Sequence, residues 1–351
     1  MRVKPDRPAH SPAVKGRRTE TKSGGADSSD KAGVALGGAI QNESASDLAR
    51  DFDAVASSGA RWVRIDINWD LIQRAGPSTY NWAPFDRVVN AARARGLNVL
   101  AIVLYTPPWA RPAGTGATTP PVRLEDYAAF ARIVAGRYSS HGVHAYEIWN
   151  EANNSRFWQP RPDAARYTAM LKAASAAIQS VDAEAFIVTA GTSPALDQGG
   201  NIAPVTFLRQ IYARGGKDAF DAVGHHPYCT PAYPGDAQWW SAWYQMSGAQ
   251  NSLRSVMAAN GDRAKQIWAT EFGAPTGGPS GSSVSESVQA KMLTRAYELF
   301  GSYRWAGPLF WYAARDLGVA GNTREDFYGL LRHDFSAKPA LKAYKALTAV
   351  R

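Results

Sequence analysis

The sequence predicts one closed barrel of eight parallel strands, each followed by a helix, a (β/α)8 architecture. From residue 32 onward, short apolar runs alternate with longer segments of helical period, as expected of repeated strand–helix units. Of the 351 residues, 45% are hydrophobic and 20% are charged, which is enough apolar material for a large core. Eight such units in one unbroken series favour a closed barrel over an open doubly wound sheet.

The predicted strands are short runs of aliphatic and aromatic residues that end at glycine, proline or polar residues. In residues 62–67, alternation places Arg64 and Asp66 on the face opposite the three aliphatic side chains. The fourth and seventh strands lie in the stretches 144–153 and 266–273. The others are expected at residues 33–39, 62–67, 98–104, 186–190, 222–226 and 308–312.

The predicted helices show apolar residues at a spacing of three to four and suitable residues at their ends. Ser46 or Asp47 can cap the first helix, which carries Leu48 and Phe52 on one face, and Gly96 ends the second. The segment after the fourth strand is rich in alanine, a strong helix former. The helices are expected at residues 46–58, 85–95, 124–138, 162–180, 204–215, 253–260, 285–300 and 339–348.

The composition of residues 1–31 predicts a disordered basic tail. Residues 32–351 are therefore expected to form the one folded domain. The segment holds eight Lys or Arg, four Asp or Glu and no aromatic residue. Such a composition buries too little apolar surface to offset the entropy of ordering. Nucleic-acid binding is the alternative for this tail, but its basic residues are scattered and not interleaved with aromatic residues.

Sequence signals for export and membrane insertion are weak. Arg17 and Arg18 could begin a twin-arginine signal, but the polar residues that follow hold no apolar run of suitable length. No later segment has about 18 uninterrupted apolar residues, so no membrane-spanning helix is predicted. Cys229 is the single cysteine, which excludes a disulfide within the chain and leaves the redox compartment open.

Two glutamates stand where predicted strands end. Glu151 follows the apolar run that begins at His144, and Glu271 closes the run that begins at Gln266. In a parallel barrel the carboxyl ends of all strands open onto one face, so these two side chains can meet across 120 residues of sequence. Cleavage of a glycosidic bond needs a proton donor and a group that stabilises the anomeric carbon, and two carboxyl groups in different protonation states supply both.

At these residues the chain resembles the clan of retaining β-glycosidases built on the TIM barrel. It is most similar to glycoside hydrolase family 39, with family 5 next. The resemblance rests on Asn150-Glu151 at the end of the fourth strand and on Glu271 at the end of the seventh. It implies that Glu151 is the acid and base, that Glu271 is the nucleophile, and that the two carboxyl groups lie about 5 to 5.5 Å apart.

The resemblance also implies a set of supporting residues. Arg64 would hold the nucleophile ionised, and Asn150 would bind the 2-hydroxyl group of the sugar. His226 would orient the acid or a sugar hydroxyl, and Tyr228 would donate a hydrogen bond to the nucleophile. Each has an ordinary structural alternative; Arg64, for example, could simply pair with a carboxylate inside the barrel.

Aromatic side chains near strand ends are candidates for stacking against sugar rings. By resemblance, Trp311 of the eighth strand would form the floor of the sugar subsite, and Trp109 is a second candidate platform. Trp69, Trp158, Trp239 and Trp240 occupy comparable positions. Packing within the core or within the loops is the alternative for all of them.

Other chemistry has little support in the sequence. His225 and His226 are adjacent rather than at helical spacing, and no cysteine pair is present, so no metal or other cofactor is expected. There is no G-x-S-x-G elbow, no G-x-G-x-x-G motif and no phosphate-binding loop. The expected partner is a carbohydrate rather than a nucleic acid or a membrane, and a monomer is expected.

The sequence thus predicts a retaining glycosidase that hydrolyses O-glycosyl bonds. The last predicted helix lies at the end of the sequence, so the accessory β-sandwich of family 39 β-xylosidases is not expected. This favours an endo-acting or broad β-glycosidase that acts on an oligo- or polysaccharide, and such a substrate class favours secretion. The alternative from another class is a catalytically silent barrel that binds carbohydrate.

Overall fold

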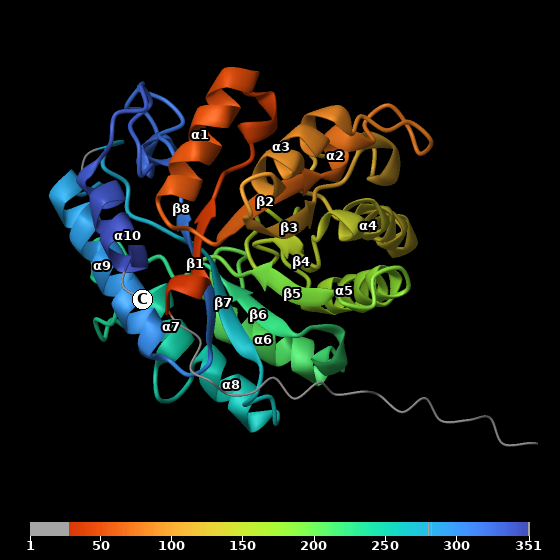
Figure 1. The fold of residues 1–351 in the computed structure, drawn as a ribbon. Coiled ribbons are helices and arrows are strands. Elements are labelled where there is room, and N and C mark those ends of the chain that lie inside the picture. The colour runs from red at the N-terminus through yellow and green to blue at the C-terminus, as the bar shows by residue number, and fades with distance from the viewer. Residues whose placement is uncertain (1–27, 280, 282, 350–351) are drawn as a thin grey trace, which may run out of the picture.

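A computed structural model describes residues 28–279, 281 and 283–349 of the chain. Over these residues, the predicted architecture is confirmed, because eight parallel strands pair in chain order and β1 also pairs with β8 to close the barrel. In Figure 1 the strands occupy the centre and the helices surround them. The strands are β1 (Ala32–Ala35), β2 (Trp62–Asn68), β3 (Asn98–Leu104), β4 (Ala145–Asn150), β5 (Phe186–Gly191), β6 (Ala222–His225), β7 (Gln266–Phe272) and β8 (Ala306–Tyr312).

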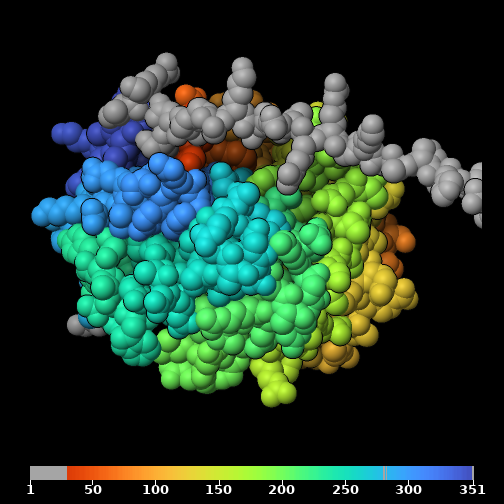
Figure 2. Space-filling model, turned by 90° about the horizontal axis from the view of Figure 1, so that it is seen from below, coloured from red at the N-terminus to blue at the C-terminus, as the bar shows by residue number. Residues whose placement is uncertain are grey.

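The helices lie outside the barrel and follow one another around it. The face drawn in Figure 2 shows this order, from the yellow of α4 through the greens of α5 and α6 to the blue of α9. The helices are α1 (Ala45–Ser57), α2 (Trp69–Ile72), α3 (Ala83–Arg93), α4 (Leu124–Tyr138), α5 (Ala164–Gln179), α6 (Pro204–Ala213), α7 (Ala242–Ser247), α8 (Leu253–Ala259), α9 (Glu286–Ser302) and α10 (Pro339–Ala349).

Side-chain caps begin several of these helices. The Ser44 hydroxyl accepts a hydrogen bond from the Asp47 amide, so α1 begins earlier than predicted and its cap is Ser44 rather than Ser46 or Asp47. Asp163 accepts hydrogen bonds from two amides of α5, and Ser285 caps α9 in the same way. These contacts satisfy amide groups that have no partner within the helix.

The hydrophobic core has two layers, which the alternation of side chains along the strands produces. The outer layer lies between strands and helices and includes Val63, Ile65 and Ile67 of β2. Arg64 and Asp66 therefore face the barrel interior, as predicted. A smaller inner layer fills the barrel with one residue from each of seven strands: Ala35, Leu100, Ala145, Val188, Ala222, Trp268 and Phe310.

The structure differs from the sequence prediction at several boundaries. β1 ends at Ala35 rather than at residue 39, and the short helices α2 and α7 form where loops were expected. Residues 1–27 of the predicted tail lie outside the described residues. The segment Ser28–Lys31, also assigned to the tail, forms a 3-10 helix, and Lys31 donates a hydrogen bond to the Ala306 carbonyl. In the part of the chain that the structure describes, no helix has the length and apolar character needed to cross a membrane.

Candidate active site

A buried ionic network joins β2, β4 and β7 at the carboxyl end of the barrel. The Arg64 guanidinium donates to both oxygens of Glu147, at 2.6 Å from Nε and 3.3 Å from Nη2. It also donates to Glu271 Oε1 at 2.5 Å and to Asn150 Oδ1 at 2.8 Å. The Arg64 and Glu147 side chains are 5% and 0% exposed. One guanidinium therefore positions three side chains from two other strands.

Glu271 reaches this network because β7 departs from regular alternation. Thr270 faces inward and donates a hydrogen bond to Glu147 Oε1, so a regular strand would turn the next side chain outward. The pairing of β7 with β8 shifts register between Ala269 and Phe272, and Phe272 packs in the outer core. This irregularity allows Thr270 and Glu271 both to face the interior, as bulges near active sites commonly do.

The end of β4 has a similar irregularity. Trp149 has a φ of 72° and Glu151 has a φ of 45°, values in the left-handed region that non-glycine residues rarely adopt. Alternation from Glu147 would place Trp149 inside the barrel. Instead Trp149 packs edge-on against Tyr105 and Trp158, while Asn150 faces Arg64. The aromatic packing and the Asn150 hydrogen bond hold this strained backbone.

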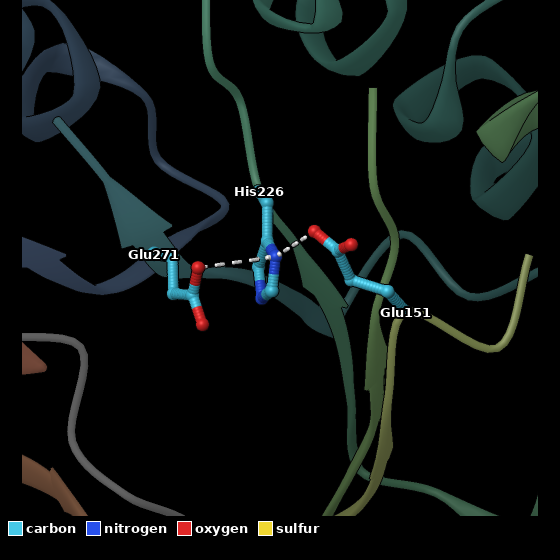
Figure 3. A group of neighbouring side chains, drawn as sticks. All are labelled: Glu151, His226 and Glu271. Atoms are coloured by element: carbon cyan, nitrogen blue, oxygen red, sulfur yellow. Dashed lines mark hydrogen bonds and ion pairs between the residues drawn. The ribbon is translucent and has the colours of Figure 1, made fainter. Parts of the chain in front are cut away.

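His226 lies between the two glutamates that end β4 and β7, as Figure 3 shows. Its Nδ1 atom is 2.9 Å from Glu151 Oε1 and 3.5 Å from Glu271 Oε2. We assign the Nδ1 proton to a hydrogen bond with Glu151, because Nδ1 faces carboxylate oxygens on both sides. The neighbouring His225 faces away, toward Thr192 and the Ala242 carbonyl, as expected from alternation in β6.

Tyrosine side chains surround Glu271 on its other side. The Tyr228 hydroxyl donates to Glu271 Oε2 at 3.0 Å. Tyr328 packs edge-on against Tyr228 and against Tyr312, at centroid distances of 5.9 and 5.5 Å. Burial, followed by the charge of Glu271, raises the pKa of both Tyr228 and Tyr312, so these hydroxyl groups remain protonated and can donate.

The two glutamates have opposite pKa shifts. Burial raises the pKa of Glu151 above its usual range, and hydrogen bonding to His226 offsets this only in part. Burial opposes ionisation of Glu271 as well, but the charges of His226 and Arg64 and the hydrogen bond from Tyr228 outweigh it. The pKa of Glu271 is therefore lowered, and the site holds one carboxyl group suited to donate a proton and one suited to remain ionised.

The structure places Trp311 differently from the prediction. Its side chain is 0% exposed, packs edge-on against Phe272 in the outer core, and donates its indole N–H to the Tyr328 carbonyl. No face of this ring is open to a sugar. Alternation in β8 instead directs Phe310 and Tyr312 inward, so Tyr312 is the aromatic residue of this strand that faces the site.

The other predicted platforms divide into buried and accessible residues. Trp109 is half-buried, packs edge-on against Trp69, and donates its indole N–H to the Gln73 carbonyl, which leaves part of its surface accessible. Trp69 and Trp158 are core residues. Trp239 and Trp240 are 67% and 39% exposed in the connection between β6 and α7.

Two residues of the site had no role in the sequence analysis, namely Glu147 and Tyr312. Glu147 accepts hydrogen bonds from Arg64, the Gly191 amide and Thr270 without any exposure to solvent. Its position inside an otherwise apolar strand was a usable signal, because a buried charge requires a partner. Tyr312 could have been found by counting alternate residues from Phe310.

Glu151, His226 and Glu271 each offer one ligand atom, and these atoms lie within 4.8 Å of one another. The same atoms could face a metal ion, since imidazole and carboxylate are common ligands. However, Arg64 is ion-paired to Glu271 at 2.5 Å, and its fixed positive charge opposes a cation at that oxygen. The donor set fits a pair of hydrogen-bonded carboxyl groups better than a metal site.

A closed (β/α)8 barrel with two glutamates, one arginine and one histidine together at its carboxyl end defines the class of TIM-barrel glycoside hydrolases. The comparisons with known families agree. The model of the cellulase family, glycosyl hydrolase family 5, matches residues 28–311, and the chain belongs to this family. This is the second of the two families that the sequence resembles.

Solved structures with the same fold include members of family 39. A family 39 glycoside hydrolase from the gut symbiont Bacteroides cellulosilyticus WH2 has a TM-score of 0.70 and 22% identity, covering 92% of this chain and 64% of its own. A monomeric β-xylosidase from Caulobacter crescentus CB15 has a TM-score of 0.69 and 18% identity, covering 94% and 70% of the two chains. The chain thus spans about two thirds of the length of these structures.

A curated protein matches a short part of the sequence. Beta-amylase 1, chloroplastic, of Arabidopsis thaliana is 28% identical over 72 residues, which is 20% of this chain and 12% of that protein.

Proposed function

We propose that this protein is a retaining β-glycosidase that acts on an oligo- or polysaccharide, with Glu151 as acid and base and Glu271 as nucleophile. The observation that carries the proposal is that oxygens of the two carboxyl groups lie within 4.8 Å of each other. Inverting enzymes keep their carboxyl groups about 6.5 to 9.5 Å apart to admit a water molecule, whereas retaining enzymes hold them at about 5 to 5.5 Å.

In the first step, Glu271 attacks the anomeric carbon and Glu151 gives its proton to the leaving oxygen. The bond between that carbon and the leaving group breaks as the covalent bond to Glu271 forms. In the second step, Glu151 removes a proton from water, the water oxygen bonds to the anomeric carbon, and the Glu271 carboxylate leaves. Each of the two steps inverts the anomeric carbon, so the product retains the configuration of the substrate.

The surrounding residues fit these roles. Arg64 and Tyr228 donate hydrogen bonds to different oxygens of Glu271, which keeps the nucleophile ionised and oriented. His226 donates to Glu151 Oε1, which leaves Oε2 to carry the transferable proton. The Asn150 oxygen is held by Arg64, so its amide N–H group is the part of that side chain available to a sugar 2-hydroxyl.

We propose that residues 32–351 act as one catalytic domain and that the protein works as a monomer on a carbohydrate, in an endo-acting or broad manner. A barrel that supplies acid, base and nucleophile from its own strands needs no second subunit for chemistry. Trp109, with part of its surface accessible, is proposed as a platform for a sugar ring.

The test compares the wild-type protein with Glu271→Gln on aryl β-glycosides and polysaccharides, with product anomers followed by NMR. Glu184→Gln is the matched control, because the Glu184 side chain is 82% exposed, outside the barrel mouth. We expect Glu271→Gln to lower turnover by at least about 1,000-fold, and the wild-type product to retain its configuration. Unchanged turnover in Glu271→Gln, or no hydrolysis of any glycan, would instead favour a silent carbohydrate-binding barrel.

A further inference from the structure

Asp66 is a third acidic residue at the carboxyl end of the barrel, and the mechanism above does not use it. It lies on the same inward face of β2 as Arg64, two residues closer to the carboxyl end, and pairs in register with Ile102 of β3. Its side chain is half-buried. Asp66 is thus one layer of side chains closer to the barrel mouth than the network around Arg64.

No hydrogen-bond or ion-pair partner of the Asp66 carboxyl group is found among residues 28–279, 281 and 283–349. The neighbouring acids differ, because Glu147 and Glu271 each accept several hydrogen bonds. A methyl group added to the exposed Gly38 would lie 3.0 Å from Asp66 Oδ2. The carboxyl group therefore borders an exposed part of the backbone and has free acceptor sites, which a half-buried acid rarely leaves unused.

The positions of Glu151 and Glu271 indicate that Asp66 lies beside the sugar that is transferred to Glu271. Glu151, on the β4 side, gives its proton to the leaving oxygen, so the leaving group lies on that side. The sugar bonded to Glu271 then extends toward β1, β2 and β8. Asp66 lies there, and so does the Tyr312 hydroxyl, which is 3.7 Å from the position of a methyl group built on Gly37.

We propose that Asp66 determines which sugar is transferred, by accepting hydrogen bonds from two neighbouring hydroxyl groups of a neutral sugar ring on the Glu271 side of the cleaved bond. The inference rests on the proposed function and deepens it. A carboxylate with two free oxygens matches two adjacent hydroxyl donors, and a site built for such donors discriminates strongly against a sugar that lacks one.

The charges around Asp66 are consistent with this role. Burial raises its pKa to about 6, the Arg64 charge opposes that shift, and the charges of Glu271 and Glu147 add to it. Burial, and to a smaller extent the charge of Asp66, raises the pKa of Tyr105, after β3, and of Tyr312, on β8. A pKa of about 6 leaves the ionised form of Asp66, which can accept two hydrogen bonds, in the majority at neutral pH.

The experiment uses the full chain and 4-nitrophenyl β-glycosides of the sugar that the wild-type protein cleaves fastest. Each substrate is compared with its 3-deoxy, 4-deoxy and 6-deoxy analogues, for wild type, Asp66→Asn and Asp66→Ala. Asp53→Asn is the control, since Asp53 is an exposed residue of α1 that pairs with Arg95. Circular dichroism and thermal unfolding establish that each variant is folded.

We expect Asp66→Ala to lower kcat/KM on the parent glycoside by about 10- to 100-fold per lost hydrogen bond, and Asp53→Asn to have no effect. On each of the two analogues that lack one of the hydroxyl groups bound by Asp66, wild type and Asp66→Ala should differ less than on the parent, by the share of the one lost hydrogen bond. Asp66→Asn keeps the volume of the side chain and should show the same pattern with a smaller loss.

Equal losses on the parent and on every deoxy analogue would overturn the inference, because a structural role affects all substrates alike. Cleavage of amino-sugar glycosides alone would also overturn it, since Asp66 would then bind a cation. These outcomes differ from failure of the proposed function, in which Glu271→Gln retains activity or the wild type cleaves no glycoside.

Discussion

Replacing Glu147 by glutamine tests whether the buried network positions the candidate nucleophile. Glu147 accepts four hydrogen bonds, two from Arg64 and one each from the Gly191 amide and Thr270, and it is fully buried. A glutamine oxygen at the Oε1 position can still accept from Gly191, Thr270 and Arg64 Nη2, but the glutamine NH2 group would face Arg64 Nε, donor against donor.

The expected loss follows from the burial of the pair. Removing one partner of a buried ion pair costs about 3 to 5 kcal/mol, because the other charge remains without compensation. Arg64 keeps its contacts with Glu271 and Asn150, so the lower end of that range applies. We therefore expect Glu147→Gln to lower the free energy of unfolding by about 3 kcal/mol.

Equilibrium unfolding in urea, followed by tryptophan fluorescence, measures this loss, with the surface variant Glu184→Gln as control. We also expect kcat/KM to fall, since Arg64 without its Nε hydrogen bond to Glu147 holds Glu271 less rigidly and the nucleophile is less well oriented. The reasoning is refuted if Glu147→Gln unfolds at the same urea concentration as the control and cleaves substrate as fast as the wild type.

Three further predictions concern the same site. The pKa of Glu271 is lowered and that of Glu151 is raised. We therefore expect kcat/KM to rise as the pH passes the pKa of Glu271, where the nucleophile ionises, and to fall as the pH passes the pKa of Glu151, where the acid loses its proton. A rate profile without the decline at high pH would contradict the role of Glu151. Glu151→Ala should lower turnover by about 100-fold or more on natural glycans but much less on aryl glycosides with good leaving groups, and equal losses would exclude the acid role. A methyl group on Gly191 would collide with His226 Nε2, so Gly191→Ala should destabilise the protein by about 1 to 3 kcal/mol. In α4, a methyl group on Gly136 meets no atom within 4 Å, so Gly136→Ala is the control, and equal unfolding temperatures for the two variants would contradict the prediction.

The sequence predicted the eight strands and the order of the helices, because both depend on periodicity within short segments. The prediction of β3 and α4 agrees with the structure at both ends. Boundaries were less accurate where a capping side chain decides them, as at Ser44, or where very short helices interrupt a loop, as at α2 and α7.

Alternation also predicted the inward side chains of β2. Arg64 and Asp66 face the interior as predicted, and the same rule applied to β8 would have identified Tyr312 instead of Trp311. The rule fails at the ends of β4 and β7, where Glu151 and Glu271 lie. Glu271 faces inward because the pairing of β7 with β8 shifts register, and Asn150 does so because Trp149 adopts a left-handed backbone.

Local pattern in the sequence and the geometry of parallel strands account for the barrel, for the strand ends that carry Glu151 and Glu271, and for the residue types available there. Which acids are paired depends on the three-dimensional arrangement of the strands. Glu147 is held by Arg64, Glu151 by His226, and Asp66 by no described residue. Pairing depends on distances of a few ångströms between strands far apart in sequence, and electrostatic and hydrogen-bond energies change steeply over those distances.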